Sequence, residues 1–425
     1  SDGYTELWEG FMETNIPIVT GMRGFEELSI SGAYRRSEYD SSNRLTGIDG
    51  GDFGTNTFAA GISWTPVNDF RVRAQFQRAI RAPNILELFA PQNTGLTSLS
   101  DPCSGFAGSD DPPTASQAAC ANTGVTPGQF GAIPPDSGQL NVVTGGNPEL
   151  EPETSDTFTV GVVVQPARIP GLSFSVDYFN IDVDEAVSTV PASFTLQNCL
   201  ETGNPVFCDL INRGTDGSLT QVPRDQAAIT ATNVNIGGFQ TDGIDFAANY
   251  IFDAGRWGRL NFDYQATWLL SFDETPVPGQ GTFDCVGFFD DSCGNPTFDY
   301  RHNLTTSWRT PWNIRANLIW RYFSGVNRID NIDTETGKIT SFKDVGAGNL
   351  RSAKLDAQSY LDLSVFWDAT ENVTFRFGVN NLLENNPPIL PQFGPSPTAN
   401  TEGNTVAGVF PAEGRFIFTA VNLSF

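Results

Sequence analysis

The stretch LNFDYQATWLL at residues 260–270 decides the fold class of this chain. Nearly every second residue is apolar or aromatic, and most residues between them are polar. Side chains in a β-strand point alternately to opposite faces, so the pattern predicts a strand with one apolar and one polar face. The apolar face would hold Leu260, Phe262, Tyr264, Ala266, Trp268 and Leu270.

The same alternation recurs along most of the chain, for example at residues 244–250, 314–322 and 373–379. Together with the turn-forming residues, it predicts about 13 strands joined alternately by short turns and long loops. The short turns are expected near 19–26, 66–69, 166–171, 253–257, 310–313 and 368–372. The long connections are expected at about 41–52, 83–153, 188–234, 273–296, 327–357 and 383–410.

Charged residues at strand centres favour a membrane barrel over a soluble β-sandwich or propeller. Arg315 and Arg321 alternate with Ala316 and Trp320, and burying such charges between packed sheets would be costly. A propeller also needs a repeat of about 40–50 residues, which is not visible. A wet lumen tolerates charges and a bilayer covers the apolar face, so we expect an all-β transmembrane antiparallel β-barrel.

The composition excludes several functional classes. The 49 acidic and 24 basic residues give a net charge of -25, which would repel nucleic acid. The G-x-S-x-G, P-loop and H-E-x-x-H motifs are absent, and His302 is the only histidine. We therefore expect no enzymatic activity, no catalytic residues, no metal site and no cofactor.

Six cysteines occur as three sequence-local pairs, all in the long loops. Their even number predicts three disulfides formed in an oxidising compartment, whereas metal binding would need different spacing. The expected disulfide cysteines are Cys103 with Cys120, Cys199 with Cys208, and Cys285 with Cys293.

Two groups of loop carboxylates have the residue types of a metal site. Asp110–Asp111 and Asp290–Asp291 do not sit in an EF-hand pattern, so we expect solvated loop residues there. The carboxylates that follow Pro148 are likewise expected to be solvated turn residues. They are Glu149, Glu151, Glu153 and Asp156.

The last stretch, GRFIFTAVNLSF at residues 414–425, ends on Phe425 within an alternating pattern. In a closed barrel the last strand pairs with the first, so a chain can end inside a strand. An odd count of about 13 strands would place Ser1 and Phe425 on opposite sides of the membrane. We therefore expect the beginning of the barrel to lie on another segment.

Several stretches together resemble the C-terminal part of TonB-dependent outer-membrane receptors. They are RAIRAPNILELF (78–89), GGNPELEPETSDTFTVG (145–161), TDGIDF (241–246), VNNLLENNPP (379–388) and the terminal Phe425. The resemblance covers essentially all 425 residues. It implies a bacterial outer-membrane barrel of about 22 strands, with an N-terminal plug domain and the first strands outside this chain.

The resemblance implies TonB-dependent active uptake of a scarce nutrient, a siderophore-type chelate or an oligosaccharide. The expected partners are the lipid bilayer, the plug with the first strands, the TonB complex through that plug, and a small-molecule or glycan ligand. Loop aromatics could stack on that ligand or pack within the loops. The candidates are Phe106, Phe130, Phe207, Phe283, Phe288, Phe289, Phe393 and Phe410.

Two other functions remain open from the sequence. A passive porin-like channel would conduct without TonB, and a barrel-anchored surface adhesin would bind a partner at its loops without uptake. A plug sequence upstream of Ser1 would separate the transporter from both alternatives.

Overall fold

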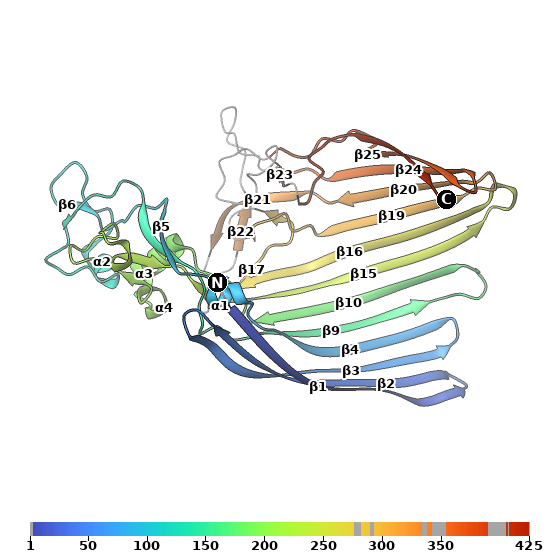
Figure 1. Ribbon diagram of the computed structural model, residues 1–425, viewed down its shortest axis with the longest axis horizontal. Helices are drawn as coiled ribbons and strands as arrows, with labels where there is room; N and C mark the ends of the chain where they lie inside the picture. Colours follow the sequence, from blue (N-terminus) through green and yellow to red (C-terminus); the bar gives the residue numbers. More distant parts are fainter. Residues whose placement is uncertain are drawn as a thin grey trace.

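A large antiparallel sheet forms most of the computed structural model, which describes residues 3–275, 282–289, 293–333, 338–341, 354–389, 405–406 and 408–424. The sheet has fourteen strands, of which β17 (Phe283–Asp284) pairs beside β16 and the rest follow one continuous order. The thirteen strands of that order confirm the predicted all-β barrel wall (Figure 1). They are β1 (Gly3–Met22), β2 (Phe25–Asn43), β3 (Ile48–Val67), β4 (Phe70–Arg81), β9 (Glu153–Val164), β10 (Leu172–Asp184), β15 (Gly238–Asp253), β16 (Arg259–Thr275), β19 (Tyr300–Arg309), β20 (Ile314–Phe323), β24 (Gln358–Thr370), β25 (Val373–Asn380) and β26 (Phe416–Leu423).

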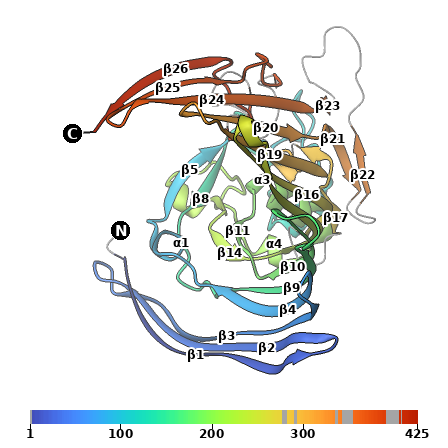
Figure 2. The same cartoon turned by 90° about the vertical axis from the view of Figure 1, so that its right-hand side faces the viewer.

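The sheet is strongly curved, and its two outermost strands are the first and the last in the chain (Figure 2). Among the described residues, β1 pairs with β2 and β26 pairs with β25, and these two outermost strands do not pair with each other. Within the described chain the sheet is therefore open between β1 and β26, and Phe425 lies outside the described residues.

The register of neighbouring strands confirms the predicted faces. Trp268 lies beside Ile244 on β15 and beside Tyr300 on β19, so apolar positions continue from strand to strand. The exposed fractions are 58% for Trp268 and 50% for Trp367. Large apolar side chains left exposed across many strands form a surface that suits lipid rather than water.

This outward apolar band ends differently at its two edges. At the short-turn end, the rings of Trp257 and Trp312 are 5.8 Å apart, and Trp308 Nε1 donates to the Trp257 carbonyl at 2.8 Å. At the other end, outward-facing positions become charged, as in the ion pair of Arg78 with Asp156. An aromatic edge and a charged edge are the expected limits of a bilayer-spanning band.

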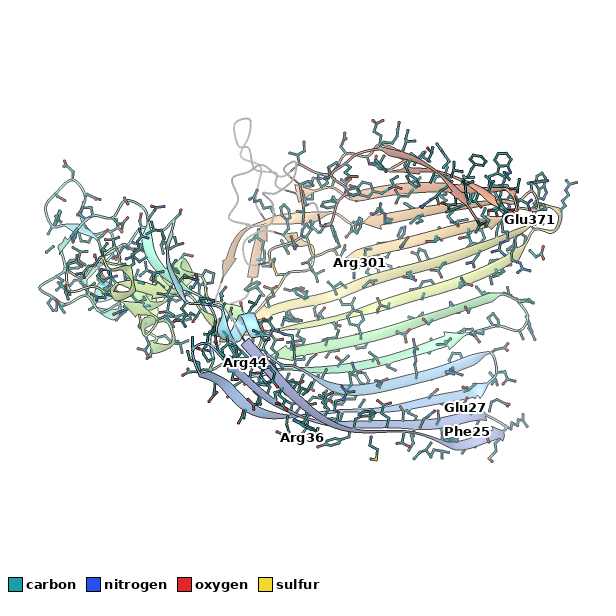
Figure 3. The ribbon with its side chains drawn as sticks, viewed as in Figure 1. Phe25, Glu27, Arg36, Arg44, Arg301 and Glu371 are labelled. Carbon is teal, nitrogen blue, oxygen red and sulfur yellow. A yellow bond between two sulfur atoms is a disulfide. The ribbon has the colours of Figure 1, made fainter. Side chains whose placement is uncertain are left out.

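The short turns lie together at one end of the strands, while the long loops extend from the other end (Figure 1). The side-chain view places Phe25, Glu27 and Glu371 at the short-turn end, with Arg36 and Arg44 farther toward the long loops (Figure 3). One of the short turns contains the 3-10 helix η2 (Gly255–Trp257).

The prediction of a long loop at residues 41–52 is wrong. Strand β2 continues to Asn43 and β3 begins at Ile48, and the Gly47 N–H donates to the Asn43 carbonyl at 2.8 Å. Main-chain pairing does not require apolar side chains, so this hairpin extends beyond the apolar band although its residues are typical of turns.

Two long loops fold together into one unit, here named the loop lobe and defined as residues 82–152 and 185–237. Strand β13 of the second loop pairs with β8 of the first, with Ile229 opposite Val142. Ile133 and Leu196, one from each loop, are buried in the shared core. The elements of the lobe are α1 (Ile85–Phe89), β5 (Asn93–Thr97), β6 (Gly105–Phe106), α2 (Gln117–Asn122), β7 (Ala132–Ile133), β8 (Leu140–Thr144), β11 (Val187–Thr189), α3 (Ala192–Thr202), α4 (Pro205–Cys208), β12 (Ile211–Asn212), η1 (Arg224–Gln226), β13 (Ala228–Thr230) and β14 (Asn233–Asn235).

A second group of loops packs on the long-loop ends of β16 to β24. Its buried cluster contains Phe289, Val326, Leu355, Tyr360 and Phe410. Its strands are β17, β18 (Phe288–Phe289), β21 (Val326–Asp333), β22 (Lys338–Ser341) and β23 (Lys354–Leu355). None of the helices in the described part of the chain has the length and apolar character that crossing a membrane requires.

Candidate functional site

The three expected cysteine pairs are disulfide-bonded in the structure. Cys103 bonds to Cys120 and Cys199 to Cys208, so each bond lies within a single loop of the lobe. The third bond joins Cys285 to Cys293 in the second group of loops.

An arginine at the end of β4 organises the base of the lobe. Arg81 donates from Nε and Nη2 to both oxygens of Glu153 on β9, at 2.5 and 2.6 Å. Its Nη1 contacts both oxygens of Glu87 on α1 at 3.0 Å. These carboxylates raise the pKa of Arg81, and burial alone would raise the pKa of Glu153, but hydrogen bonds from Arg81 and Val187 hold it below its usual value.

The RAPN stretch also begins a short helix. The Asn84 side chain accepts hydrogen bonds from the N–H groups of Leu86 and Glu87, and Glu87 accepts one from the Asn84 N–H. This reciprocal capping box fixes α1 at the point where β4 leaves the wall. Two carboxylates expected to be solvated, Glu153 and Asp156, instead pair with Arg81 and Arg78 on β4, because both lie on β9 within the sheet.

Asparagine side chains connect the two loops above this base. Asn147 Nδ2 donates to the Asn233 carbonyl at 3.0 Å, and Asn233 Nδ2 donates to the Glu87 carbonyl at 3.2 Å. Asn235 donates to the Glu151 carbonyl and accepts from the Glu151 N–H, both at 2.7 Å. Because each bond spans from one loop to the other, the bases of the two loops are held as one platform.

A buried ion pair links the loops again in the core of the lobe. Arg213 Nη1 lies 2.5 Å from Asp101 Oδ2, and the two side chains are 4% and 1% exposed. Arg213 also donates to the carbonyl and the hydroxyl of Thr123. The pair is fully hydrogen-bonded, as a buried charge requires.

The loop aromatics have different positions in the structure. Phe207, Phe283, Phe289 and Phe410 are buried, between 1% and 5% exposed, so their ring faces are occupied by loop packing. Phe130 and Phe288 pack at the margins of buried clusters. Phe106 on β6 is 44% exposed, and Phe393 lies outside the described residues. Phe106 stays a prediction as a ligand contact.

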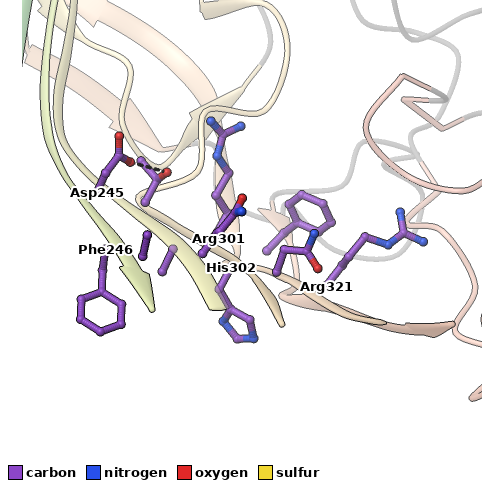
Figure 4. Close-up of a pocket in the computed structure, with 11 residues that line it drawn as sticks. Asp245, Phe246, Arg301, His302 and Arg321 are labelled. Carbon is purple, nitrogen blue, oxygen red and sulfur yellow. Dashed lines mark hydrogen bonds between the residues drawn. The ribbon is translucent and has the colours of Figure 1, made fainter. Parts of the chain in front are cut away.

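A cavity of about 500 Å³ lies against the wall formed by β15, β16, β19 and β20 (Figure 4). Asp245 and Arg301 point to one side of the sheet, while Phe246 and His302 point to the opposite side. The first side is here named the inner wall. The polar and aromatic residues that line the cavity on the inner wall are Asp245, Gln265, Thr267, Arg301, Asn303, Arg321 and Phe323.

The charges of this cavity are partly paired. Asp245 accepts a hydrogen bond from Thr267 Oγ1 at 2.8 Å, and Arg321 donates to Asp362 at 2.7 Å. Within the described chain, Arg301 forms no ion pair and its side chain is exposed. The site therefore offers the exposed Arg301 guanidinium and side-chain amides, which can donate hydrogen bonds to oxygen-rich ligands.

Arg321 also borders a second cavity of about 390 Å³, formed with Asn381, Phe410 and Glu413. Asp362, which pairs with Arg321, accepts the Asn381 N–H at 2.7 Å. The alternation of β15 and β20 predicted that Asp245 and Arg321 lie on the polar face. Sequence reasoning missed the two cavities, because their residues meet across strands distant in sequence.

Within the described residues, no three histidine, cysteine or carboxylate side chains lie close enough to hold a metal ion. Asp110 and Asp111 are exposed, while Asp290 and Asp291 lie outside the described residues. The described residues form a wall with a polar inner face, an apolar outer surface and a folded cap of loops.

Solved structures share this architecture. The siderophore receptor PirA from Acinetobacter baumannii aligns over 100% of this chain and 55% of its own, with a TM-score of 0.54 and 12% identity. A ferric enterobactin receptor mutant from Pseudomonas aeruginosa, bound to enterobactin, gives 0.55 and 13%, with coverage of 100% and 55%. The FrpB iron transporter from Neisseria meningitidis gives 0.53 and 12%, with coverage of 100% and 46%. The chain thus spans about half the length of these proteins.

Curated proteins give no match to this sequence. A family profile described as "TonB dependent receptor-like, beta-barrel" matches residues 3–382, which is most of the chain. The sequence resemblance, the thirteen-strand wall and this match agree with one another. The chain belongs to the TonB-dependent receptor β-barrel family, whose members lie in the outer membrane of Gram-negative bacteria.

Proposed function

We propose that this protein is the barrel part of a receptor that takes up a scarce nutrient by TonB-dependent active transport. The described chain supplies the barrel wall and the loops that recognise the ligand. An N-terminal plug and the first strands, carried on another segment, complete the barrel, and the TonB complex acts through that plug.

The observation that carries this proposal is the joined loop lobe above a polar inner wall. Cross-loop bonds at Asn147, Asn233 and Asn235 hold two long loops as one cap. Below it, Arg301 and Arg321 line a cavity of about 500 Å³ on the inner wall. A cap and a lumen-side site together fit capture followed by passage, whereas an adhesin would need the cap alone.

The chemistry of the cavity supports a ligand rich in oxygen atoms. Guanidinium and amide groups donate to the oxygens of a metal chelate or to the hydroxyls of an oligosaccharide equally well. PirA is described as a siderophore receptor and the Pseudomonas aeruginosa protein as a ferric enterobactin receptor, which makes ferric chelates the first ligands to test.

The test is uptake by cells that produce the complete receptor. Radiolabelled ferric chelates and oligosaccharides would be supplied to cells with and without TonB. We expect accumulation of one ligand class that requires TonB. Accumulation without TonB would indicate a channel, and binding to the cell surface without uptake would indicate an adhesin.

A double variant tests the cavity itself. Arg301→Ala with Arg321→Ala removes two charge-assisted donors, which should weaken ligand binding by roughly tenfold or more. Arg256→Ala serves as the control, because Arg256 lies in a short turn over the Trp257 ring. Unchanged binding by the double variant would show that the ligand does not use this cavity.

A further inference from the structure

Four arginines form a row across the inner wall near the short turns. Arg259 on β16 lies opposite Arg309 on β19, and Arg309 lies opposite Arg315 on β20. The row continues through Phe366 on β24 to Arg376 on β25. We name Arg259, Arg309, Arg315 and Arg376 the arginine row.

The side chains of the arginine row face the lumen. Arg309 is eight residues from Arg301 on the same strand, and even spacing in a strand keeps side chains on one face. In Figure 4, Arg301 points to the inner side of the sheet and His302 to the opposite side. Trp308, the neighbour of Arg309, belongs to the outward aromatic edge. Adjacent side chains in a strand face opposite sides, so this also places Arg309 on the inner side.

Two carboxylates, Asp253 and Asp368, lie next to the four arginines, so the row keeps an excess of positive charge among the described residues. Arg315 contacts Asp368 at 3.1 Å, whereas Arg259, Arg309 and Arg376 form no ion pair in the described part of the chain. Asp253, which is opposite Arg259, accepts the Gly255 N–H with its carboxylate. Like charges directly opposite each other destabilise a sheet, so the row is costly unless an anionic partner lies against it.

Aromatic rings hold part of the row in place. The Arg376 guanidinium lies 5.2 Å from the Phe366 ring centroid and 4.8 Å from that of Phe418. Arg315 lies 5.3 Å from the same Phe366 ring. Such cation–π contacts fix the position of a charge without neutralising it, which leaves it available to a partner.

The length of the row indicates the kind of partner. Four steps between strands, each about 4.8 Å, separate Arg259 from Arg376 by roughly 19 Å. A single carboxylate or phosphate would contact two neighbouring arginines at most. A polypeptide segment with several carboxylates can follow the whole row.

We propose that the arginine row is the docking surface for an acidic stretch of the polypeptide that fills the lumen. This inference rests on the proposed function, which places a plug domain inside the barrel. It adds where that domain is held, at the short-turn end of β16 to β25, and which charge its contact surface carries.

Photo-crosslinking in outer membranes tests the docking directly. The complete receptor would carry a benzophenone amino acid at position 309, and the cross-linked peptide would be identified by mass spectrometry. We expect a lumen segment with at least two Asp or Glu residues within a few positions of the link. A cross-link to a neutral or basic lumen segment would overturn this inference and leave the transport proposal intact.

Charge reversal gives a second readout. Arg309→Glu with Arg315→Glu should lower the yield of that cross-link, placed now at position 259, by roughly tenfold, since two exposed charge contacts become repulsive. Arg256→Glu, at the same end of the barrel but in a turn, should leave the yield unchanged. An equal yield from the reversed and control proteins would overturn the docking surface.

Channel recording separates the two proposals. If the lumen is filled and held by the row, the wild-type receptor stays closed in planar bilayers, and the reversed double variant opens. A wild-type protein that already conducts freely would contradict the transport proposal itself. A lumen that stays closed in the reversed double variant as it does in the wild type, with an unchanged yield of the peptide cross-link, would contradict the docking surface alone.

Discussion

Glu274 is a carboxylate in apolar surroundings at the long-loop end of β16. It lies opposite Phe239 on β15 and Phe283 on β17, and Phe283 is buried. Its sequence neighbour Asp273 faces outward among other charges, so this level lies outside the apolar band. Burial raises the pKa of Glu274 to about 7.

The direction of this shift predicts how the stability of the pairing between β16 and β17 depends on pH. A raised carboxyl pKa means that the folded state binds the proton more tightly than the unfolded state, so the stabilisation is complete below pH 4.5 and is lost as pH rises to about 7. We expect hydrogen-exchange protection of β17 to fall across this window, after correction for intrinsic rates. Glu274→Gln should abolish the dependence, while the exposed-helix variant Glu201→Gln should retain it. Protection independent of pH in the wild type would contradict the prediction.

At the scale of single residues, the sequence was informative where spacing is local. The cysteine pairs are separated by 17, 9 and 8 residues, and such short separations made the pairing predictable. Arg81 with Glu153 was not predictable, because 72 residues separate them and the contact depends on β4 lying beside β9. The loop phenylalanines look alike in sequence, although burial separates Phe207 from Phe106.

At the scale of elements, alternation predicted the faces of the strands better than their ends. Within the apolar band, period-two patterning is enforced by lipid on one side and water on the other. Beyond the band both faces of a strand meet water, so its side chains no longer alternate between apolar and polar. For this reason the sequence pattern predicts a loop at residues 41–52, where β2 ends and β3 begins.

Strand β20 offers a matched pair of positions for testing the faces. Leu318 points outward beside Leu363, and Asn317 points inward beside Ser307 and Ser364. Leu318→Arg places a charge midway between the two edges of the band and should cost about 2–4 kcal/mol, with a far smaller cost for Asn317→Arg. Urea titrations of folding into lipid vesicles would measure both. Equal losses of stability would mean that the two faces are assigned wrongly.

At the scale of the whole molecule, one wall carries two separately organised ends. The short-turn end has an aromatic outer edge and the arginine row inside, whereas the long-loop end has a disulfide-stapled cap. The thirteen-strand count and the alternation of turn lengths were predictable, because each strand records its own period and its own turn. The joining of loops 82–152 and 185–237 was not, because its contacts bridge two strands and their turn.

We therefore expect the two loops of the lobe to unfold together when the contacts between them are weakened. Cys103–Cys120 and Cys199–Cys208 each staple a single loop, so non-covalent contacts alone hold the loops together. Arg213 with Asp101 is the buried pair among them. Arg213→Met would leave the Asp101 carboxylate buried without its partner, at a cost of about 3–5 kcal/mol.

Hydrogen exchange on the complete receptor would show the consequence. We expect Arg213→Met to speed exchange in both loops together, including β8 in one and β13 in the other, while β9 and β10 in the wall keep their protection. Arg224→Met, on the exposed helix η1, should leave the pattern unchanged. Faster exchange confined to residues 185–237 would mean that the two loops unfold independently. Ligand binding to one loop would then not stabilise the other.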